Sequence, residues 1–384
     1  MGKKVSEIPV RVAVKDVEVD ANLDSNLGEV LLVTPYLGFG DLLYHTPLIR
    51  MLSNTYDGGV DVWCLNPEPL QNNPYIKNLF TMEGKESPNP WDFYFDNVFH
   101  MSMDHNQKYE DLRMTNIHMV DYVTLGTLNL ILRDHEKYLT LNWSHEDEHK
   151  VRSLLENENV ITNESEDSNL VIVNPSITWP SRTLPLDYYK ELIARIQDNG
   201  DKVVLVGKEI NPSGFLPDMY DSDEEKKLKR DETKTMYPAE NFPGTINLID
   251  KLSLMECAAL YSMAKLAINT ENGNLVISGT NAKCWNVYIP TLTAPEFRVP
   301  FRCGSQDHKT VVVKNANNYY PSSDYKLKRG HYDTITVPVE LPTIDLIYDG
   351  YLQANQLFKV QCFLEKDEPV IVKKDGSYYY SGRN

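Results

Sequence analysis

The chain has 384 residues, of which 41% are hydrophobic and 24% are charged, and its formal net charge is −17. This length is enough for two domains with a core each, and the negative charge argues against sequence-independent binding to a phosphate backbone. No apolar run reaches the roughly 18 residues of a membrane-spanning helix, and the N-terminus carries no hydrophobic signal segment. The five cysteines are far apart without a CxxC pair, which favours reduced thiols of a cytoplasmic protein over disulfides or metal ligands.

Strands and helices alternate through the first 160 residues. Compact apolar runs predict strands at 29–34, 59–65, 93–99 and 137–141. Apolar residues at helical spacing predict helices at 41–54, 112–130 and about 145–157. Apolar strand runs separated by helices predict a parallel sheet that is buried on both faces.

A second alternating series follows an acidic, Asn- and Ser-rich stretch at 161–169, which predicts a linker. The expected strands of this series are 170–175, 202–207, 245–249, 265–270 and 283–289. The expected helices are 186–198, 253–263 and 273–281. The two series predict an α/β protein with two Rossmann-like domains, 1–160 and 170–340, which face each other across a cleft.

Three further segments complete the organisation. The charged stretch within 210–243 predicts a solvated insertion, and its Asp221-Ser222-Asp223 resembles the acidic motif of metal-dependent sugar transfer but has no flanking strand. The aromatic and basic stretch 317–333 fits either a local basic groove or a solvated loop. Residues 341–384 are expected to form a terminal helix, at 343–360, followed by a hairpin or tail.

The first candidate site is the turn after the opening strand, which contains Gly38, Gly40 and Asp41. It is not a GxGxxG dinucleotide fingerprint, because leucines stand in the place of the third glycine. Open α/β sheets bind ligands at this carboxyl edge, so Asp41 is predicted to face a substrate as the helix N-cap, with His45 and Thr46 one turn on. Asp is also a favoured N-cap without any catalytic role, and that alternative stays open.

The second candidate site is the stretch 173–189, in which a strand ends in a Pro-, Ser- and Thr-rich turn before a helix. Ser176, Thr178 and Ser181 offer hydroxyl donors, and Arg182 offers a guanidinium fork that suits a diphosphate. Such a loop before a helix N-terminus is typical of an anion site. The alternative is an ordinary turn whose arginine faces water.

The third candidate site is the turn Glu271-Asn272-Gly273 after an expected strand. Gly273 would let backbone N–H groups approach a ligand closely. Glu271 fits two roles, as an acceptor for ribose hydroxyls or as a helix cap.

Taken together, four sequence blocks resemble the heptosyltransferase-like glycosyltransferases, the family typified by ADP-heptose:lipopolysaccharide heptosyltransferases. The blocks are YLGFGDLLYHTPLIRML, NPSITWPSRTLPLDYYKELIARI, DKVVLVG and NLIDKLSLMECAALYSMAKLAINTENGNLVISG. The resemblance implies a GT-B enzyme whose C-terminal domain holds most of a nucleotide-sugar donor. It also implies an inverting displacement that needs no metal and no cofactor besides the donor substrate.

The resemblance also implies roles for single residues. The family's proposed general base falls on Asp41, and its diphosphate-binding basic residue falls on Arg182, where Lys is common. The acidic residue, small polar residue and glycine of the last block fall on Glu271, Asn272 and Gly273. Two departures are that the family usually has Asp in place of Glu271 and His in place of Val276, where the histidine is thought to help hold the donor phosphates.

Several alternatives remain for the reaction and its partners. The acceptor fits a glycan, a lipid-linked molecule or a modified nucleic acid, since some viral enzymes of this kind glycosylate hydroxymethylated DNA bases. Other readings are a sugar-nucleotide epimerase or a non-catalytic GT-B module. The expected location is the cytoplasm, that of the host if the chain is viral, with peripheral membrane contact as a further option; the sequence does not name the sugar or its nucleotide.

Overall fold

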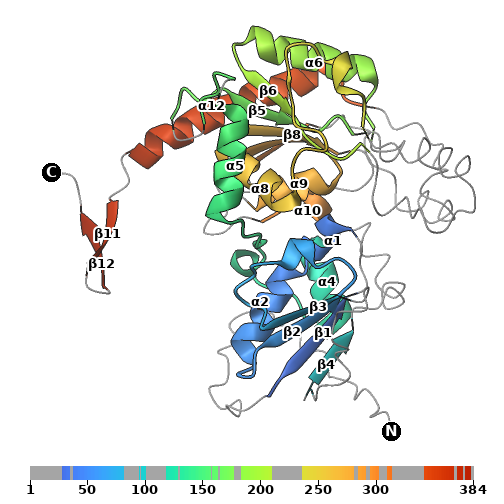
Figure 1. Ribbon diagram of the computed structural model, residues 1–384, viewed down its shortest axis with the longest axis vertical. Helices are drawn as coiled ribbons and strands as arrows, with labels where there is room; N and C mark the ends of the chain where they lie inside the picture. The colour runs from blue at the N-terminus through green and yellow to red at the C-terminus, as the bar shows by residue number, and fades with distance from the viewer. Residues whose placement is uncertain are drawn as a thin grey trace, which may run out of the picture.

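Figure 1 shows the computed structural model, in which two parallel sheets lie one above the other with helices packed on each. The structure describes residues 28–34, 38–81, 95, 97–100, 118–128, 130–156, 158–162, 165–176, 183–209, 236–280, 284–290, 295–301, 309–313, 341–366, 370–374 and 377–381. Within these ranges, no helix is both long enough and apolar enough to cross a membrane.

The first sheet is parallel, with the strand order β3-β2-β1-β4. Its strands are β1 (Val30–Thr34), β2 (Val60–Cys64), β3 (Asn78–Thr81) and β4 (Asn97–His100). All five residues of β1 are buried, as expected for a central strand covered on both faces. The helices α2 (Thr46–Thr55) and α4 (Met119–Leu128) pack against each other, and α2 also packs on β2.

The second sheet has six parallel strands in the order β10-β9-β8-β5-β6-β7. Its strands are β5 (Leu170–Val173), β6 (Lys202–Leu205), β7 (Ile246–Asn247), β8 (Leu266–Thr270), β9 (Trp285–Ile289) and β10 (Thr310–Val312). The chain builds outward from β5 on one side and from β8 on the other, so the strand order reverses between these two strands. In open α/β sheets this switch point is where ligands bind, beyond the carboxyl ends of the strands.

Helices cover both faces of the second sheet. The helices are α6 (Leu186–Asp198), α8 (Leu254–Met263), α9 (Gly273–Gly279) and α12 (Ile344–Lys366). The helix α12 packs on β8, β9, β10 and α6, and beyond it β11 (Val370–Lys374) and β12 (Ser377–Ser381) form an antiparallel hairpin. The expected terminal helix and hairpin are therefore confirmed.

The helix α5 (His145–Leu155) lies beside the second sheet in space, although it precedes the expected linker in sequence. It packs on α8, where Lys150 forms an ion pair with Glu256. A capping box begins this helix, in which Ser144 accepts a hydrogen bond from the Asp147 backbone N–H and the Asp147 carboxylate accepts one from Ser144. The helix therefore ties the two halves of the chain together.

Two local predictions were wrong, and one strand was missed. The helix expected at 41–54 is two helices, α1 (Phe39–Leu43) and α2, because Pro47 in the first turn of α2 has no N–H to continue a helix from α1. Residues 137–141 form no strand: Arg50 donates to the Tyr138 carbonyl (3.1 Å), so a side chain from α2 takes the place of a neighbouring strand. The short strand β3 was not expected.

Several predictions fall wholly or partly outside the described residues. The insertion 210–243 is described only from residue 236, and Asp221-Ser222-Asp223 and the stretch 317–333 are not described. The helix expected at 112–130 is described as α4 from Met119.

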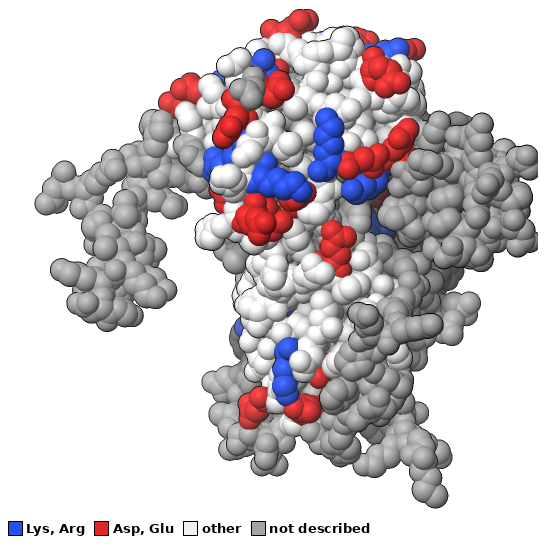
Figure 2. Space-filling view, in the orientation of Figure 1, with Lys and Arg blue, Asp and Glu red and all other residues white. Residues whose placement is uncertain are grey.

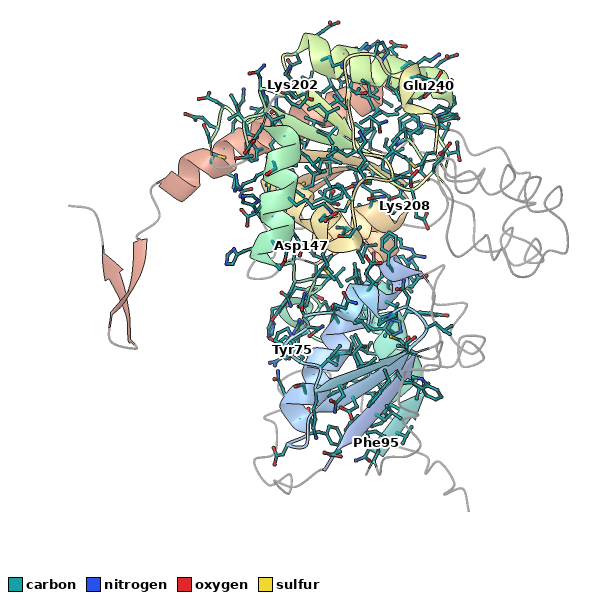
Figure 3. The ribbon with its side chains drawn as sticks, viewed as in Figure 1. Tyr75, Phe95, Asp147, Lys202, Lys208 and Glu240 are labelled. Atoms are coloured by element: carbon teal, nitrogen blue, oxygen red, sulfur yellow. The ribbon has the colours of Figure 1, made fainter. Side chains whose placement is uncertain are left out.

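Both sheets direct the carboxyl ends of their strands toward the junction between the domains. In Figure 3, Phe95, which precedes β4, lies at the far end of the first domain. Lys202 at the start of β6 lies away from the junction, whereas Lys208, just after β6, lies close to it. The two edges at which α/β sheets bind ligands therefore face each other.

Candidate functional site

The junction is formed by α1, which follows β1, and by α9, which follows β8. Gly40 and Gly273 lie against each other, since a Cβ atom on Gly40 would be 3.2 Å from the Gly273 Cα. A Cβ atom on Gly273 would clash with the ring of Phe39. The absence of a side chain at both positions therefore allows this close approach of two backbones.

Three charged side chains meet at this contact. Arg298, the last residue of the short helix α10 (Pro295–Arg298), donates from Nη1 to Oδ1 of Asp41 at 3.2 Å. Its Nε lies 3.6 Å from Oε1 of Glu271, which is ion-pair range but longer than a hydrogen bond. The exposed fractions of the side chains differ: 38% for Asp41, 11% for Arg298 and 2% for Glu271. Asp41 is therefore the carboxylate of this group that solvent or a ligand can reach.

The surroundings of Arg298 hold it in place. The Tyr44 hydroxyl donates to the Arg298 carbonyl at 2.6 Å, and the guanidinium lies 5.9 Å from the Tyr44 ring centroid and 5.1 Å from that of Phe297. Burial alone would lower the pKa of Arg298, but the nearby carboxylates of Asp41 and Glu271 outweigh it and raise that pKa above its usual value. Burial raises the pKa of Tyr44, so its hydroxyl stays protonated as a donor.

Asp41 occupies a different position from the one expected. The N-cap of α1 is Gly38, and Asp41 lies inside the first turn with its carboxylate directed at Arg298. The prediction that Asp41 caps the helix was wrong, because the helix begins two residues before it. A Cβ atom on Gly38 would lie 3.1 Å from Oδ2 of Asp41, so this glycine leaves room for the carboxylate.

His45 and Thr46 are fully buried behind Asp41. The His45 Nδ1–H donates to the Asp41 carbonyl at 2.7 Å, and burial lowers the pKa of His45 to about 4, so the ring is neutral near pH 7. Thr46 donates from its hydroxyl to the Leu43 carbonyl (2.7 Å) and accepts from the Thr140 N–H (2.9 Å). Both side chains support the bend between α1 and α2, and a role for either in acceptor binding stays a prediction.

The second-domain side of the junction is an asparagine network. Asn272 caps α9, since its Oδ1 accepts from the Asn274 N–H at 2.9 Å, and its Nδ2 donates to Asn174 Oδ1 at 3.0 Å. Asn174 in turn donates to the Val206 carbonyl at 2.7 Å. The network connects the carboxyl ends of β5, β6 and β8. The alternative that Glu271 caps this helix was wrong.

The remaining predicted site residues lie at the same edge or outside the described residues. Ser176 is buried just after β5 and forms an isolated antiparallel bridge with Met236. Val276 is buried in α9 with a side-chain methyl 3.5 Å from the position of a Cβ on Gly40. Thr178, Ser181 and Arg182 fall within residues 177–182, which are not described. Within the described ranges, no group of three or more His, Cys, Asp or Glu side chains converges as a metal site.

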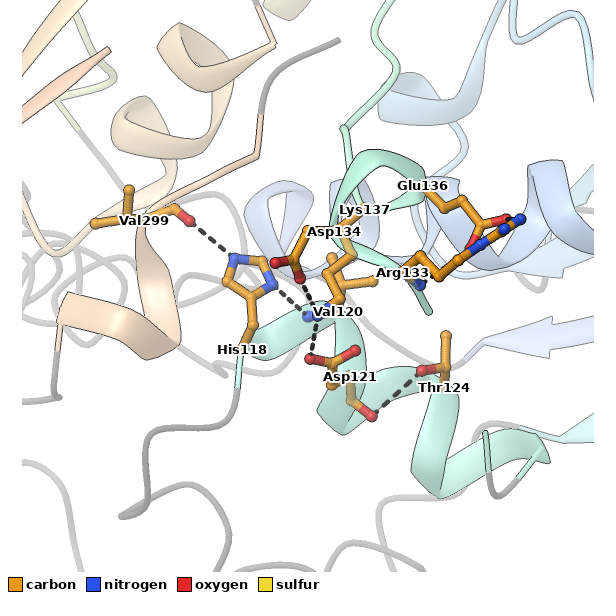
Figure 4. A network of polar contacts seen from close by, with 9 residues as sticks. All are labelled: His118, Val120, Asp121, Thr124, Arg133, Asp134, Glu136, Lys137 and Val299. Carbon is orange, nitrogen blue, oxygen red and sulfur yellow. Dashed lines mark hydrogen bonds and ion pairs between the residues drawn. The ribbon is translucent and has the colours of Figure 1, made fainter. Parts of the chain in front are cut away.

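The segment 297–301 of the second domain docks on α4 of the first, as Figure 4 shows around His118. His118 Nδ1 accepts from the Val120 N–H at 3.1 Å, so the ring proton is on Nε2, which donates to the Val299 carbonyl at 2.8 Å. Lys137 lies nearby, between Asp121 (2.7 Å) and Asp134 (2.9 Å). This contact fixes the backbone on which Arg298 is carried.

Sequence reasoning missed Arg298. The available signal was a single arginine in the mostly apolar stretch PEFRVPF, which comes shortly after a predicted strand and therefore near the carboxyl edge of the sheet.

Comparison with known proteins shows which solved structures share this fold. No family model matches the chain, and no curated protein matches it by sequence. Among solved structures, a glycosyl transferase family 9 protein from Veillonella parvula aligns with a TM-score of 0.59 at 14% identity, over 88% of this chain and 98% of that one. The heptosyltransferase TibC of enterotoxigenic E. coli, described as dodecameric and iron-containing and solved with ADP-D-beta-D-heptose, aligns with a TM-score of 0.51 at 12% identity, over 88% and 76%. The chain thus has the two-domain α/β fold of the GT-B class, as the resemblance implied.

Proposed function

We propose that the chain is a glycosyltransferase that moves a sugar from a nucleotide-diphosphate sugar to an acceptor hydroxyl, with inversion and without a metal. The observation that carries the proposal is the meeting of Asp41 with Arg298 and Glu271 at the facing edges of the two sheets. At this junction, the partly exposed carboxylate of Asp41 in the first domain lies opposite the switch point of the second sheet. The fold shared with known glycosyltransferases supports the same reading.

The donor would bind on the second domain. As the bond between the sugar and the diphosphate breaks, negative charge grows on the leaving nucleoside diphosphate and must be offset by fixed donors and cations. The family resemblance assigns this work to Ser176, Thr178, Arg182 and the turn Glu271-Asn272-Gly273. The asparagine network supports that assignment in part, because it holds the turn at 271–273 rigid beside the carboxyl end of β5.

The acceptor would be activated by Asp41. The acceptor oxygen forms a bond to the anomeric carbon while the bond to the diphosphate oxygen breaks, and the acceptor proton passes to the Asp41 carboxylate. General-base help of this kind is typically worth about 10²–10⁴-fold in rate. The 38% exposure of the Asp41 side chain gives the acceptor hydroxyl access to it.

Donor entry would require the two domains to separate at α1 and α9. Phe39 and Gly40 lie directly against Gly273, so a ligand that approaches the Gly273 backbone from the side of α1 would have to displace them. Closure after donor binding would bring Asp41 back to the sugar, which is the usual way in which two-domain enzymes couple binding to chemistry.

On the face shown in Figure 2, the described residues favour a glycan or lipid-linked acceptor over DNA. On the face shown in Figure 2, Lys and Arg side chains are interleaved with Asp and Glu around the junction, and the described residues form no continuous basic strip there. A duplex needs such a strip to offset its phosphates.

A donor panel tests the proposal. Thermal unfolding is measured with ADP-, UDP-, GDP- and CMP-linked sugars, since a ligand at a hundred times its Kd stabilises the folded chain by about 2.7 kcal/mol. The donor that binds is then incubated alone and with candidate acceptors. We expect one nucleotide class to raise Tm and to lose its sugar only when an acceptor is present. Conversion of the donor without an acceptor would favour an epimerase, and no stabilisation by any donor would contradict the proposal.

A further inference from the structure

Arg298 lies outside the four sequence blocks that carry the family resemblance, yet it connects the domains at Asp41. Its guanidinium forms an ion pair with one carboxylate from each domain. Nη1 pairs with Asp41 and Nε pairs with Glu271. The planar, forked guanidinium can direct N–H groups at two partners in fixed directions, whereas a lysine ammonium acts as a single point charge.

The exposure of the three side chains shows which of them is anchored. Glu271 is 2% exposed and Arg298 is 11% exposed, whereas Asp41 is 38% exposed. A buried carboxylate needs a cation beside it, because an uncompensated charge in the interior is costly. Glu271 and Arg298 therefore form the fixed, buried pair of the group, and this pair orients the carboxylate of Asp41.

The backbone of Arg298 is fixed as firmly as its side chain. Its carbonyl accepts the Tyr44 hydroxyl at 2.6 Å, and the next carbonyl, that of Val299, accepts His118 Nε2–H at 2.8 Å. The Tyr122 and Phe297 rings meet edge to face, with centroids 6.1 Å apart. The guanidinium thus has a defined position relative to α1, which carries Asp41.

Direct binding of the donor diphosphate by Arg298 is the competing role. It has less support, because a phosphate needs accessible N–H groups and this side chain is 11% exposed with two carboxylates already beside it.

We propose that Arg298 is a positioning residue, anchored by Glu271, that holds the Asp41 carboxylate in the direction needed to accept the acceptor proton. This inference rests on the proposed function. It changes the expected role of Glu271 from a donor contact to a support for Arg298. A misplacement of about 1 Å at a reacting group can cost about 10² in rate, which sets the scale of the effect.

The test is Arg298→Lys, which keeps the positive charge beside Glu271 but loses the fork. We expect kcat to fall by about 10²-fold while the donor Kd, measured by titration calorimetry, is unchanged. Arg195→Lys is the matched control, since Arg195 pairs with Glu191 and Asp345 on the surface of α6 and α12, far from the junction. Unchanged kcat in Arg298→Lys, or a weakened donor Kd with kcat retained, would overturn the positioning role.

Two further variants separate positioning from a general loss of structure. Glu271→Gln should lower kcat with the donor Kd retained, whereas a donor contact at Glu271 would show as weaker donor binding and contradict the inference. Arg298→Ala should regain part of its kcat in guanidinium chloride and not in sodium chloride at the same concentration; equal responses to both salts would also contradict it.

If the unsubstituted chain transfers no sugar to any acceptor, the proposed function and this inference both fail. If the unsubstituted chain does transfer sugar and Arg298→Lys has the same kcat, only the inference fails.

Discussion

Two clusters of buried charge in this chain are built alike but differ in what they leave exposed. In the second domain, Lys265 Nζ donates to Asp201 at 2.7 Å and the Tyr351 hydroxyl donates to the other Asp201 oxygen, with side-chain exposures of 3% for Lys265 and 6% for Asp201. At the junction, Arg298 has two carboxylates beside it, and one of them, Asp41, is 38% exposed.

The difference separates a structural pair from a candidate site. At Asp201 both carboxylate oxygens are engaged by groups of the same domain, and the result is that α12 is fixed to the sheet. At the junction the carboxylates outnumber the cation, the partners come from two domains, and the excess charge faces outward. Burial of a charge alone is therefore weak evidence of function, whereas a partly exposed carboxylate held by a buried cation at a sheet edge is stronger evidence.

The largest effect on stability is expected at the structural pair. Lys265→Met removes the cation beside Asp201 and leaves a buried carboxylate without its counter-ion, which typically costs about 3–5 kcal/mol. Urea unfolding measures this loss, and turnover per folded molecule should stay unchanged. Lys190→Met, on the exposed face of α6, is the control and should change stability by less than about 0.5 kcal/mol. A loss of turnover in folded Lys265→Met would contradict the view that the Asp201 cluster is structural and only the junction cluster is catalytic.

A smaller effect, which depends on pH, is expected at His45 behind the site. Its pKa is about 4 in the folded chain and about 6.5 when unfolded, so the unfolded chain binds the proton first as pH falls. The stability due to neutral His45 is complete above pH 6.5 and is lost as pH falls toward 4, by at most about 3 kcal/mol. His45→Asn keeps a donor for the Asp41 carbonyl but does not titrate. The free energy of unfolding is measured at pH 4.5 and pH 7.5 for the unsubstituted chain and for His45→Asn. The difference between the two pH values should be smaller in His45→Asn, and equal differences would contradict this account.

The smallest effect is expected at the glycine contact. Gly273→Ala places a methyl group against the Phe39 ring, which is only half-buried and can shift, so we expect a cost of about 1 kcal/mol, the low end for overpacking. The double variant Phe39→Ala with Gly273→Ala should relieve the clash and show non-additive stabilities in urea unfolding. Additive effects would mean that α1 and α9 do not touch in solution.

The sequence was sufficient for the parts of the fold that depend on local pattern. Helix 186–198 was predicted at its observed bounds, and the strand and helix on either side of Glu271 were predicted to within two residues, because apolar periodicity is a local property. Residues 137–141 were misassigned, because an apolar segment held by the Arg50 side chain has the same sequence pattern as a strand that pairs with a neighbour.

The candidate site was predictable in part: the turns that carry Asp41 and Glu271 were both predicted, but Arg298, which lies between them, was not. The glycine-containing turn and the carboxyl-edge rule pointed to Asp41, but its partner Arg298 is 257 residues away in the chain. Pairings of that separation depend on how the two domains dock, and neither composition nor periodicity carries that information. For the same reason, the sequence left two roles open for Glu271, a helix cap or a ligand contact, whereas in the structure Glu271 forms an ion pair with Arg298.

Asp41→Asn measures the central claim most directly, because it removes the base while leaving Arg298 paired with Glu271. Transfer rate and donor Kd are determined on the same preparation, with the unfolding midpoint as a check on the fold. We expect transfer to fall by about 10²–10⁴-fold while the donor Kd and the midpoint stay close to those of the unsubstituted chain. Transfer at the unsubstituted rate would contradict the assignment of Asp41 as the base and, with it, the assignment of this junction as the catalytic site.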